Sequence, residues 1–349
     1  MNTQLNFAEN NKSSIYIVMV YLITSFLSNV TLGASSTNTI EKNDISNALN
    51  EGIYRFEKGE YSEANALFSS AIQQQPSNAK AFQFLGMSQY KLQDNKKAIQ
   101  SLQKSIEIHP DTAESHYALG ISYLARTGDV SVLKIRKTLK KAITHLNKAI
   151  EINPSHSRAN FYLIQVLINA PSIMGGDEDK GLTLNSQLKT IAPLQHMVVN
   201  STIAIKNEDY EEAEKILLDA DKKFPNKTMI AYSLGELYLR LEQYSQALTY
   251  GKNFLAGPKL WDETSNNSGH YLLARAYKGL GNKSESQKHY ALVLKNTNSK
   301  RMKKQIKREL DELDGKVLPA DPEETSEELT EEQLNDPDFL KSLSKEETS

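Results

Sequence analysis

The sequence predicts an all-α fold, a solenoid of about seven helix–turn–helix units. Two observations support this class. Pro76 and Pro110 each open a similar segment, "PSNAKAFQFLG" and "PDTAESHYALG", and lie 34 residues apart. The 349-residue chain is also rich in helix-forming side chains, with only 16 glycines and 10 prolines. A fixed period of this length is typical of a repeat architecture in which neighbouring units share a continuous core.

Each predicted unit consists of two amphipathic helices joined by a short polar turn, such as "GEYSEA" or "NEDYEEA". Small residues recur where the two helices would approach each other closely. Prolines recur where the second helix would stop, since proline lacks the N–H that a helix needs. The recurring positions are Gly52, Gly86, Gly120 and Gly235 in first helices, Ala64, Ala98, Ala142, Ala213 and Ala247 in second helices, and Pro76, Pro110, Pro154, Pro193 and Pro225 at their ends.

With this period and these marks, residues 45–298 resemble the tetratricopeptide repeat family. The resemblance implies a right-handed superhelical solenoid. The seven units start near Ile45, Ala79, Ala113, Ser157, Leu194, Thr228 and Asn267. Repeat seven departs from the pattern, with Ser286 at the alanine position and Asn298 at the proline position.

Repeat three is ten residues longer than the period and contains "LKIRKTLKK" (133–141), with five basic residues in nine. Two interpretations remain open for this segment. It is either a contact for an anionic lipid or an acidic partner, or a solvated helix face.

Repeat four contains the acidic loop "PSIMGGDEDKG" (171–181). A phosphate loop would need a preceding strand and the GxxxxGK[ST] pattern, and a calcium loop would need ligands that this sequence lacks. The loop is therefore predicted to be a turn, in which Gly175 and Gly176 supply positive φ angles and the acids favour the start of the next helix. It also resembles a turn found in periplasmic repeat proteins that accompany solute-binding transport systems.

The N-terminal residues 1–34 are predicted to be a signal peptide or a membrane anchor, followed by a linker over 35–44. The uncharged run Ile15–Val30 precedes small residues, and cleavage after Ala34 would give an exported, periplasmic protein. The alternative is an inner-membrane anchor formed by residues 15–30.

The C-terminal part is predicted to contain a capping helix over 299–315 and an acidic, disordered tail over 316–349. The tail has a formal charge of −8. Because the whole chain has −2, the remainder has +6.

No catalytic or metal-binding motif is present in the sequence, so we expect a non-enzymatic protein without a cofactor or metal. There is no cysteine, no GxSxG serine motif and no HExxH pair among the seven histidines. The nearly balanced charge gives no reason to expect a nucleic-acid partner.

The expected function is that of an exported scaffold or adaptor that binds proteins in a concave groove. The family resemblance implies that first-helix positions line this groove, and its apolar part suits a peptide or amphipathic segment of a partner. Some of these side chains have an equally plain role in packing against the next repeat.

The alternative is a periplasmic ligand-binding accessory of a transport system, for which a closed pocket would be expected. The predicted groove residues are Leu49, Ile53, Phe56, Met87, Tyr90, Tyr117, Ile121, Leu124 and Phe161. Later groove positions, which are more polar, are Val198, Thr202, Tyr232, Glu236, Arg240, Tyr271, Arg275 and Lys278.

Overall fold

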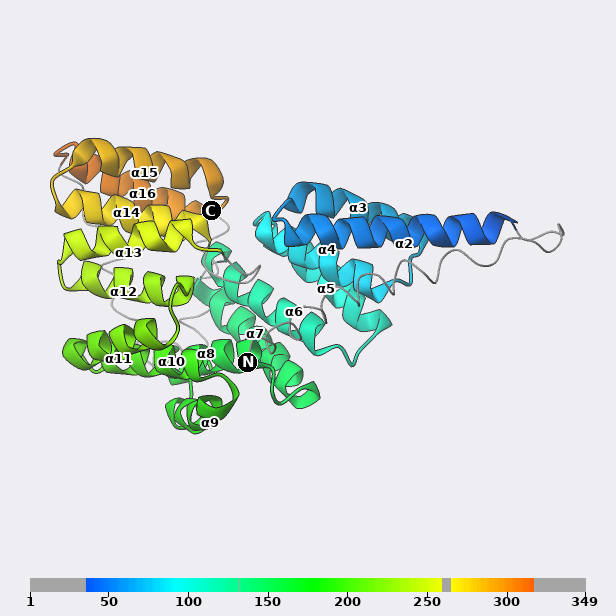
Figure 1. The fold of residues 1–349 in the computed structure, drawn as a ribbon, viewed down its shortest axis with the longest axis horizontal. Coiled ribbons are helices and arrows are strands. Elements are labelled where there is room, and N and C mark those ends of the chain that lie inside the picture. Colours follow the sequence, from blue (N-terminus) through cyan, green and yellow to red (C-terminus); the bar gives the residue numbers. More distant parts are fainter. Residues whose placement is uncertain (1–35, 131, 259–264, 317–349) are drawn as a thin grey trace, which may run out of the picture. The chain divides into compact units, whose positions relative to one another are not determined.

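The structure is a computed structural model that describes residues 36–130, 132–258 and 265–316 (Figure 1). The predicted signal segment and nearly all of the predicted acidic tail lie outside these residues. The chain divides into two units, residues 1–44 and 45–349, and the repeats lie in the second. Among the described residues, no helix is both long enough and apolar enough to cross a membrane.

The described chain forms fifteen α-helices and two short 3₁₀ helices, which confirms the predicted all-α class. Consecutive helices pack as hairpins along the sequence. The helices are α2 (Ser36–Glu57), α3 (Tyr61–Gln74), α4 (Ala79–Lys91), α5 (Asn95–Ile108), α6 (Ala113–Arg126), η1 (Thr127–Asp129), α7 (Val132–Ile152), α8 (Ser157–Asn169), η2 (Ser172–Met174), α9 (Glu178–Ile191), α10 (Pro193–Lys206), α11 (Tyr210–Lys223), α12 (Thr228–Arg240), α13 (Tyr244–Ala256), α14 (Asn266–Gly279), α15 (Lys283–Asn296) and α16 (Lys300–Leu313).

The even-numbered helices α2 to α14 are the first helices of the seven repeats, and the odd-numbered helices α3 to α15 are the second helices. Small residues bring the two together as the sequence predicted. A Cβ atom at Gly86 would lie 2.5 Å from the Leu102 side chain, and one at Gly120 would lie 2.9 Å from Leu146. The five recurring alanines are fully buried.

Side-chain caps fix where several helices begin. Asn78, Asp94, Asp177, Asp209 and Asn282 each accept a hydrogen bond from a backbone N–H in the first turn of the following helix. Such caps satisfy N–H groups that have no partner within the helix. The caps explain why the helices begin at equivalent positions in different repeats, although the turns before them differ in sequence.

The ten additional residues of repeat three extend its second helix. α7 has 21 residues, whereas most second helices have 14, and η1 precedes it. The basic segment 133–141 therefore lies within the first turns of α7.

Helix α2 begins at Ser36, within the predicted linker over 35–44. The segment "STNTIEKND" contains neither glycine nor proline, so no residue in it interrupts the helix. The predicted boundary at Ile45 coincides instead with the division between the two units.

The acidic loop of repeat four forms a structured turn. Gly175 has a φ of +105°, as predicted, and its Cβ position would lie 3.0 Å from the Ile143 side chain of α7. Gly176 does not have a positive φ, so that part of the prediction was wrong. Its hydrogen is needed for another reason, because a Cβ there would lie 1.7 Å from the carbonyl oxygen of Ala170.

The acidic residues of the loop stabilise the start of the following helix, α9. Asp177 caps α9 by accepting from the Lys180 N–H at 3.0 Å, and Glu178 pairs with Lys206 at 2.6 Å. Among the described residues, no group of three or more His, Asp or Glu side chains could hold a metal ion.

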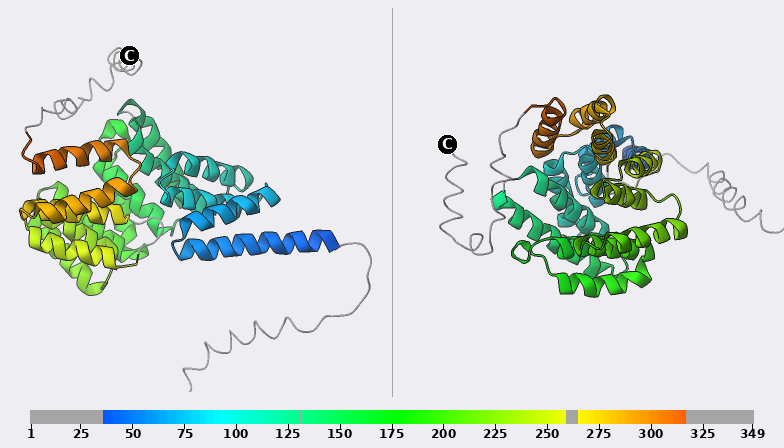
Figure 2. Two further views of the ribbon diagram at one scale, coloured as in Figure 1. Left: turned by 90° about the horizontal axis from the view of Figure 1, so that it is seen from above. Right: turned by 90° about the vertical axis from the view of Figure 1, so that its left-hand side faces the viewer.

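Helix α16 covers the end of the array beside α15 (Figure 2). Ile306 is fully buried, and Met302, Leu310 and Leu313 pack around Tyr290 and Val293. One apolar stripe on an otherwise charged helix thus closes the last exposed core surface.

Candidate binding surface on the first helices

The first helices form what we call the inner face of the repeat array. In the described part of the chain, successive first helices contact one another from α4 to α14, whereas successive second helices do not pack together. A stack curves toward the side on which its elements are closest. The inner face is therefore the side on which a partner segment would be enclosed by several repeats.

The predicted groove residues divide between the core and the surface. Five of them are buried: Phe56, Met87, Tyr117, Ile121 and Phe161. The other four are half-buried: Leu49, Ile53, Tyr90 and Leu124. Phe56 and Met87 share one cluster with Leu49, Ile53 and Leu124, while Tyr117 and Ile121 share another with Tyr90 and Leu124. Phe161 belongs to a third cluster in repeats four and five.

This placement restricts how the predicted groove residues can act. Packing between repeats accounts for the buried five, so only the half-buried four present accessible apolar surface. Their role in binding stays a prediction.

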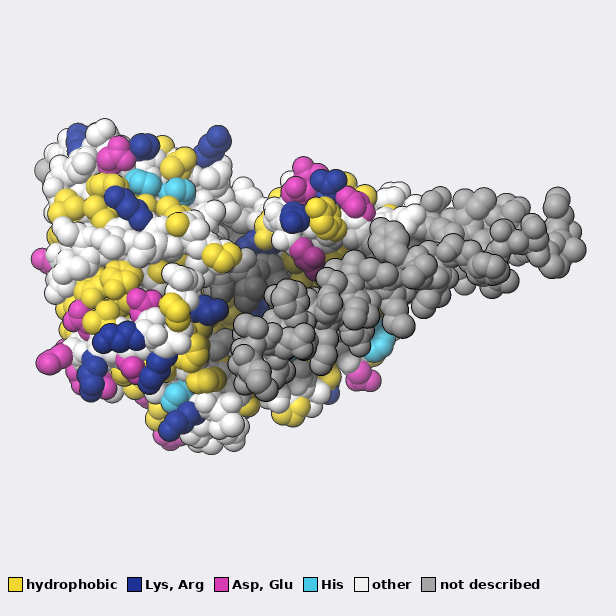
Figure 3. Space-filling model, viewed as in Figure 1, with side chains coloured by type: hydrophobic (Ala, Val, Ile, Leu, Met, Phe, Trp, Pro, Cys, Tyr) yellow, Lys and Arg dark blue, Asp and Glu magenta, His cyan; other side chains and the backbone are white. Residues whose placement is uncertain are grey.

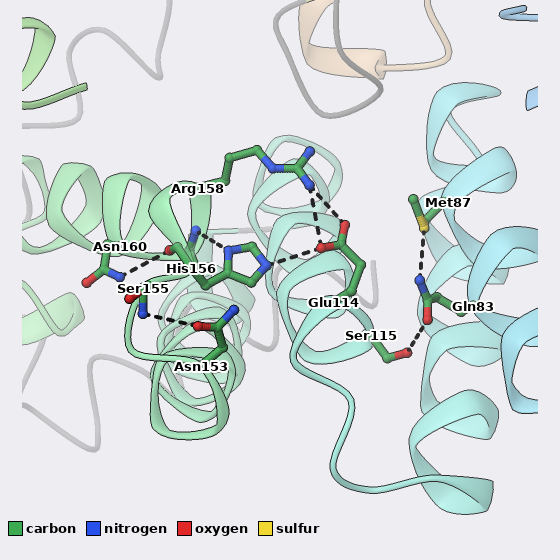
Figure 4. A network of polar contacts seen from close by, with 10 residues as sticks. Gln83, Met87, Glu114, Ser115, Asn153, Ser155, His156, Arg158 and Asn160 are labelled. Atoms are coloured by element: carbon green, nitrogen blue, oxygen red, sulfur yellow. Dashed lines mark hydrogen bonds and ion pairs between the residues drawn. The ribbon is translucent and has the colours of Figure 1, made fainter. Parts of the chain in front are cut away.

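The middle of the inner face is occupied by a polar network (Figure 4). Glu114 of α6 accepts hydrogen bonds from His156 and from Arg158, each at 3.2 Å. The other ring nitrogen of His156 accepts from the Ala159 N–H at 3.1 Å, so the imidazole is neutral with its proton on Nε2. Arg158 also lies 5.1 Å above the Tyr117 ring. The network therefore caps α8 and ties repeat three to repeat four.

A second polar contact joins repeats two and three in the same view. The Ser115 hydroxyl donates to the Gln83 side-chain oxygen at 3.2 Å, and the Gln83 amide lies 3.8 Å from the Met87 sulfur (Figure 4). These groups are satisfied by one another.

The inner face is hollowed at repeats six and seven. A pocket of about 330 Å³ lies there, between α12, α14 and α16. Four of the more polar groove positions predicted from the sequence line it: Tyr232, Glu236, Tyr271 and Arg275. The rest of its lining comprises Gln93, Ser265, Asn267, Ser268, Val293, Thr297 and Met302.

The pocket contains both charge signs and several hydroxyl groups. Arg275 lies 3.5 Å from Glu236 and 5.8 Å from the centre of the Tyr271 ring. Burial and the nearby Glu309 carboxylate raise the pKa of Tyr271 to about 12, and burial and Glu236 raise the pKa of Tyr232. Both phenols therefore stay protonated at neutral pH and can donate hydrogen bonds.

Contacts with α16 fix the far wall of the pocket. Gln305 donates to the Tyr271 hydroxyl oxygen at 2.6 Å. Lys278 pairs with Glu309 at 2.5 Å and with Glu312 at 2.6 Å. Burial opposes the charge on Lys278, but these two carboxylates outweigh it and raise its pKa.

The turn between α4 and α5 contributes the opposite rim. The Gln93 side chain donates to the Asn296 carbonyl oxygen at 2.5 Å and accepts from the Asn298 N–H at 3.2 Å. Hydroxyls, amides and one ion pair suit the polar atoms of an extended peptide better than an apolar ligand.

Two histidine pairs were missed by the sequence analysis. Nδ1 of His116 lies 3.1 Å from Nδ1 of His145, and Nδ1 of His270 lies 3.0 Å from Nδ1 of His289. Figure 3 shows histidine side chains at the surface over α14 and α15. The sequence placed His116 and His270 at equivalent positions, and their partners each follow the recurring small residue (Ala142, Ser286) by three. That shared spacing was the available signal.

The pairs are hydrogen bonds between neutral rings. His116 Nε2 lies 3.0 Å from the Pro110 carbonyl oxygen, which only accepts, so Nδ1 of His116 must accept from His145. Burial lowers the pKa of all four histidines, that of His145 to about 4.

Comparison with known proteins agrees with the repeat pattern. Family models described as "TPR repeat" and "Tetratricopeptide repeat" match residues 86–125, 200–258 and 268–299. The PEX5-related proteins of Mus musculus and Homo sapiens are each 34% identical to this chain over 76 residues, which is 22% of this chain. These residues are 13% and 12% of the two relatives, so the match spans about an eighth of their length.

A solved structure supports the fold. A tetratricopeptide repeat protein from Parabacteroides merdae ATCC 43184 has a TM-score of 0.52 with 13% sequence identity. The alignment covers 77% of this chain and 98% of that chain. At this identity the likeness concerns the architecture alone.

Proposed function

We propose that this chain, which matches tetratricopeptide repeat models over three segments, is a non-enzymatic scaffold that binds a segment of a partner protein on its inner face. Such repeats generally bind protein partners and are typically non-catalytic. The observation that supports this function most is the pocket of repeats six and seven. It combines groove positions from two successive repeats with side chains that can pair with peptide groups.

The half-buried apolar residues of repeats one to three extend the proposed site. Leu49, Ile53, Tyr90 and Leu124 could hold the apolar side chains of the partner segment, while the polar pocket fixes its orientation. In this arrangement the apolar contacts supply affinity and the pocket supplies specificity.

A second candidate, a ligand-binding accessory of a transport system, would need an enclosed apolar cavity. The pocket of repeats six and seven is open to solvent and mixes charged and hydroxyl groups with apolar surface, and a second pocket of about 410 Å³ beside Thr228 and Tyr250 is likewise open and mixed. Both features favour the scaffold.

The proposal is tested by capturing partners with the full chain and then measuring affinity with a pocket variant. Arg275→Gln removes the pocket's positive charge and leaves Glu236 without its ion-pair partner. We expect the dissociation constant to rise about tenfold, as for a hot-spot residue. The melting temperature should change little, because the pair is partly exposed and such pairs add little stability.

Lys252→Gln, which removes an exposed positive charge on α13 outside the pocket, is the matched control. If both variants bind the captured partner as tightly as the unmodified chain, the pocket has no part in recognition.

Export is the second part of the proposal. It is motivated by the apolar run Ile15–Val30 and the small residues after it. N-terminal sequencing of the protein isolated from its native cells should give a start near Ser35. A chain that retains Met1 in the soluble cytosolic fraction would contradict export.

A further inference from the structure

Two basic segments that are distant in sequence lie near each other in the fold. Helix α16 begins with exposed Lys300, Arg301, Lys303 and Lys307, and the extension of α7 presents Lys134, Arg136, Lys137 and Lys140. The short helix η1 contacts both α7 and α16, which brings the two segments together. We call these eight residues the basic surface.

The basic surface has no internal compensation. Several lysines elsewhere pair with nearby acids, such as Lys104 with Glu107 and Lys215 with Glu212. None of the eight residues of the basic surface forms an ion pair with another described residue. Neither α7 nor α16 has an acid in its first turn, so these cations also oppose the helix dipoles. An anionic partner would relieve both kinds of repulsion.

The chain itself contains a suitable polyanion. Residues 317–349 include eleven acids and two lysines. They follow α16 almost directly, because α16 ends at Leu313 and the described chain continues to Lys316. An extended chain of this length spans roughly 110 Å, and α16 is only about 21 Å long. Length therefore does not prevent the segment from returning along α16 to α7.

A membrane surface fits less well. A helix that binds at a bilayer surface needs exposed apolar side chains beside its cations. In α16 the apolar side chains Met302, Ile306, Leu310 and Leu313 pack against α14 and α15 instead. The basic surface therefore offers charge without an apolar anchor.

We propose that residues 317–349 bind to the basic surface of the same molecule. The tether gives the segment an effective concentration on the order of millimolar, so it competes strongly with external anions. The segment thereby keeps the basic surface from binding other polyanions, while the inner face remains available to a partner.

Zero-length cross-linking of the full chain tests this proposal. A water-soluble carbodiimide joins carboxylates to lysine amines that are in contact, and mass spectrometry identifies the linked residues. At about 20 mM salt we expect most links from residues 317–349 to reach Lys134, Lys137, Lys140, Lys300, Lys303 or Lys307, and we expect them to fall several-fold at about 500 mM salt.

The triple variant Lys300→Gln, Lys303→Gln, Lys307→Gln should also reduce the links to Lys134, Lys137 and Lys140. The matched triple variant Lys80→Gln, Lys189→Gln, Lys252→Gln, at exposed lysines outside the basic surface, should not. Links spread over all exposed lysines would overturn the proposal. So would links that form only between molecules in a mixture of isotopically light and heavy protein.

Discussion

Phe56 packs between two other aromatic rings of the first two repeats. Its ring lies 5.3 Å from Tyr61 and 5.5 Å from Phe84, both in edge-to-face geometry, and the residue is 6% exposed. Tyr90, at another predicted groove position, is only half-buried beside Tyr117 and Ile121. We therefore expect Phe56 to contribute more to the free energy of folding than Tyr90.

We predict that Phe56→Ala lowers the free energy of unfolding by about 3–5 kcal/mol, the usual cost of a large-to-small core change. Tyr90→Ala should cost about half as much, because less of its surface is buried. Denaturant unfolding of the two variants measures this. Equal losses would show that Tyr90 belongs to the core as fully as Phe56.

The histidine pairs make stability depend on pH. Their pKa values are lower in the folded chain than in the unfolded chain, where histidine titrates near 6.5. As the pH falls below 6.5, the unfolded chain therefore binds protons that the folded chain does not, and stability decreases. For His145 this continues to its folded pKa of about 4.

We predict that His145→Leu flattens the decline of the melting temperature between pH 6.5 and about 4.5, by the equivalent of about 1–2 kcal/mol. Repeat four has Leu184 at the equivalent position, so a leucine fits this architecture. His109→Gln, at an exposed histidine outside both pairs, is the control. Identical slopes for all three proteins would contradict this account.

At the scale of the helices, one turn position recurs with a left-handed backbone. Repeats one and seven have Gly59 and Gly281 there, with φ of +79° and +72°. Repeats two, five and six have Gln93, Glu208 and Glu242 with φ near +60°. A side chain in this conformation costs free energy that glycine does not, so three repeats contain a strained turn.

Glu242→Gly should therefore stabilise the chain by about 0.5–1 kcal/mol after the greater flexibility of the unfolded glycine is included. Gly281→Ala should destabilise it by about 1 kcal/mol. A Cβ at Gly281 would meet no atom within 4 Å, so steric clash does not contribute to the second value. A lower melting temperature for Glu242→Gly together with a higher one for Gly281→Ala would show that the left-handed φ does not determine the stability of these turns.

At the scale of the whole molecule, the period alone predicted the array well. The observed helices begin at Ala79, Ala113, Ser157 and Thr228, where the sequence placed four of the unit starts. This succeeds because the small residues and the stop signals act locally, within one pair of helices. Residues 36–44 of the predicted linker are helical, and no local signal in that segment would stop a helix.

The candidate site was less predictable. A groove position taken from the repeat family predicts the side of the helix on which a residue lies. The burial of its side chain depends on how much of it the next repeat covers, and no local sequence pattern encodes that. Tyr117 is fully buried for this reason, although its position was predicted to face a partner. The pocket also includes Gln93 from a turn some 140 residues away from Tyr232, and such a contact requires the folded array.

The central claim is that partners bind on the inner face, and site-specific photo-cross-linking tests it most directly. A benzophenone amino acid would replace Leu124, Arg240 or Tyr271 at groove positions of first helices, or exposed Thr183 or Thr249 on second helices. After irradiation in the native cells, we predict one common partner adduct from the three inner-face positions and none from the two second-helix positions. Adducts of equal yield from both sets, or adducts from the second helices alone, would contradict the account.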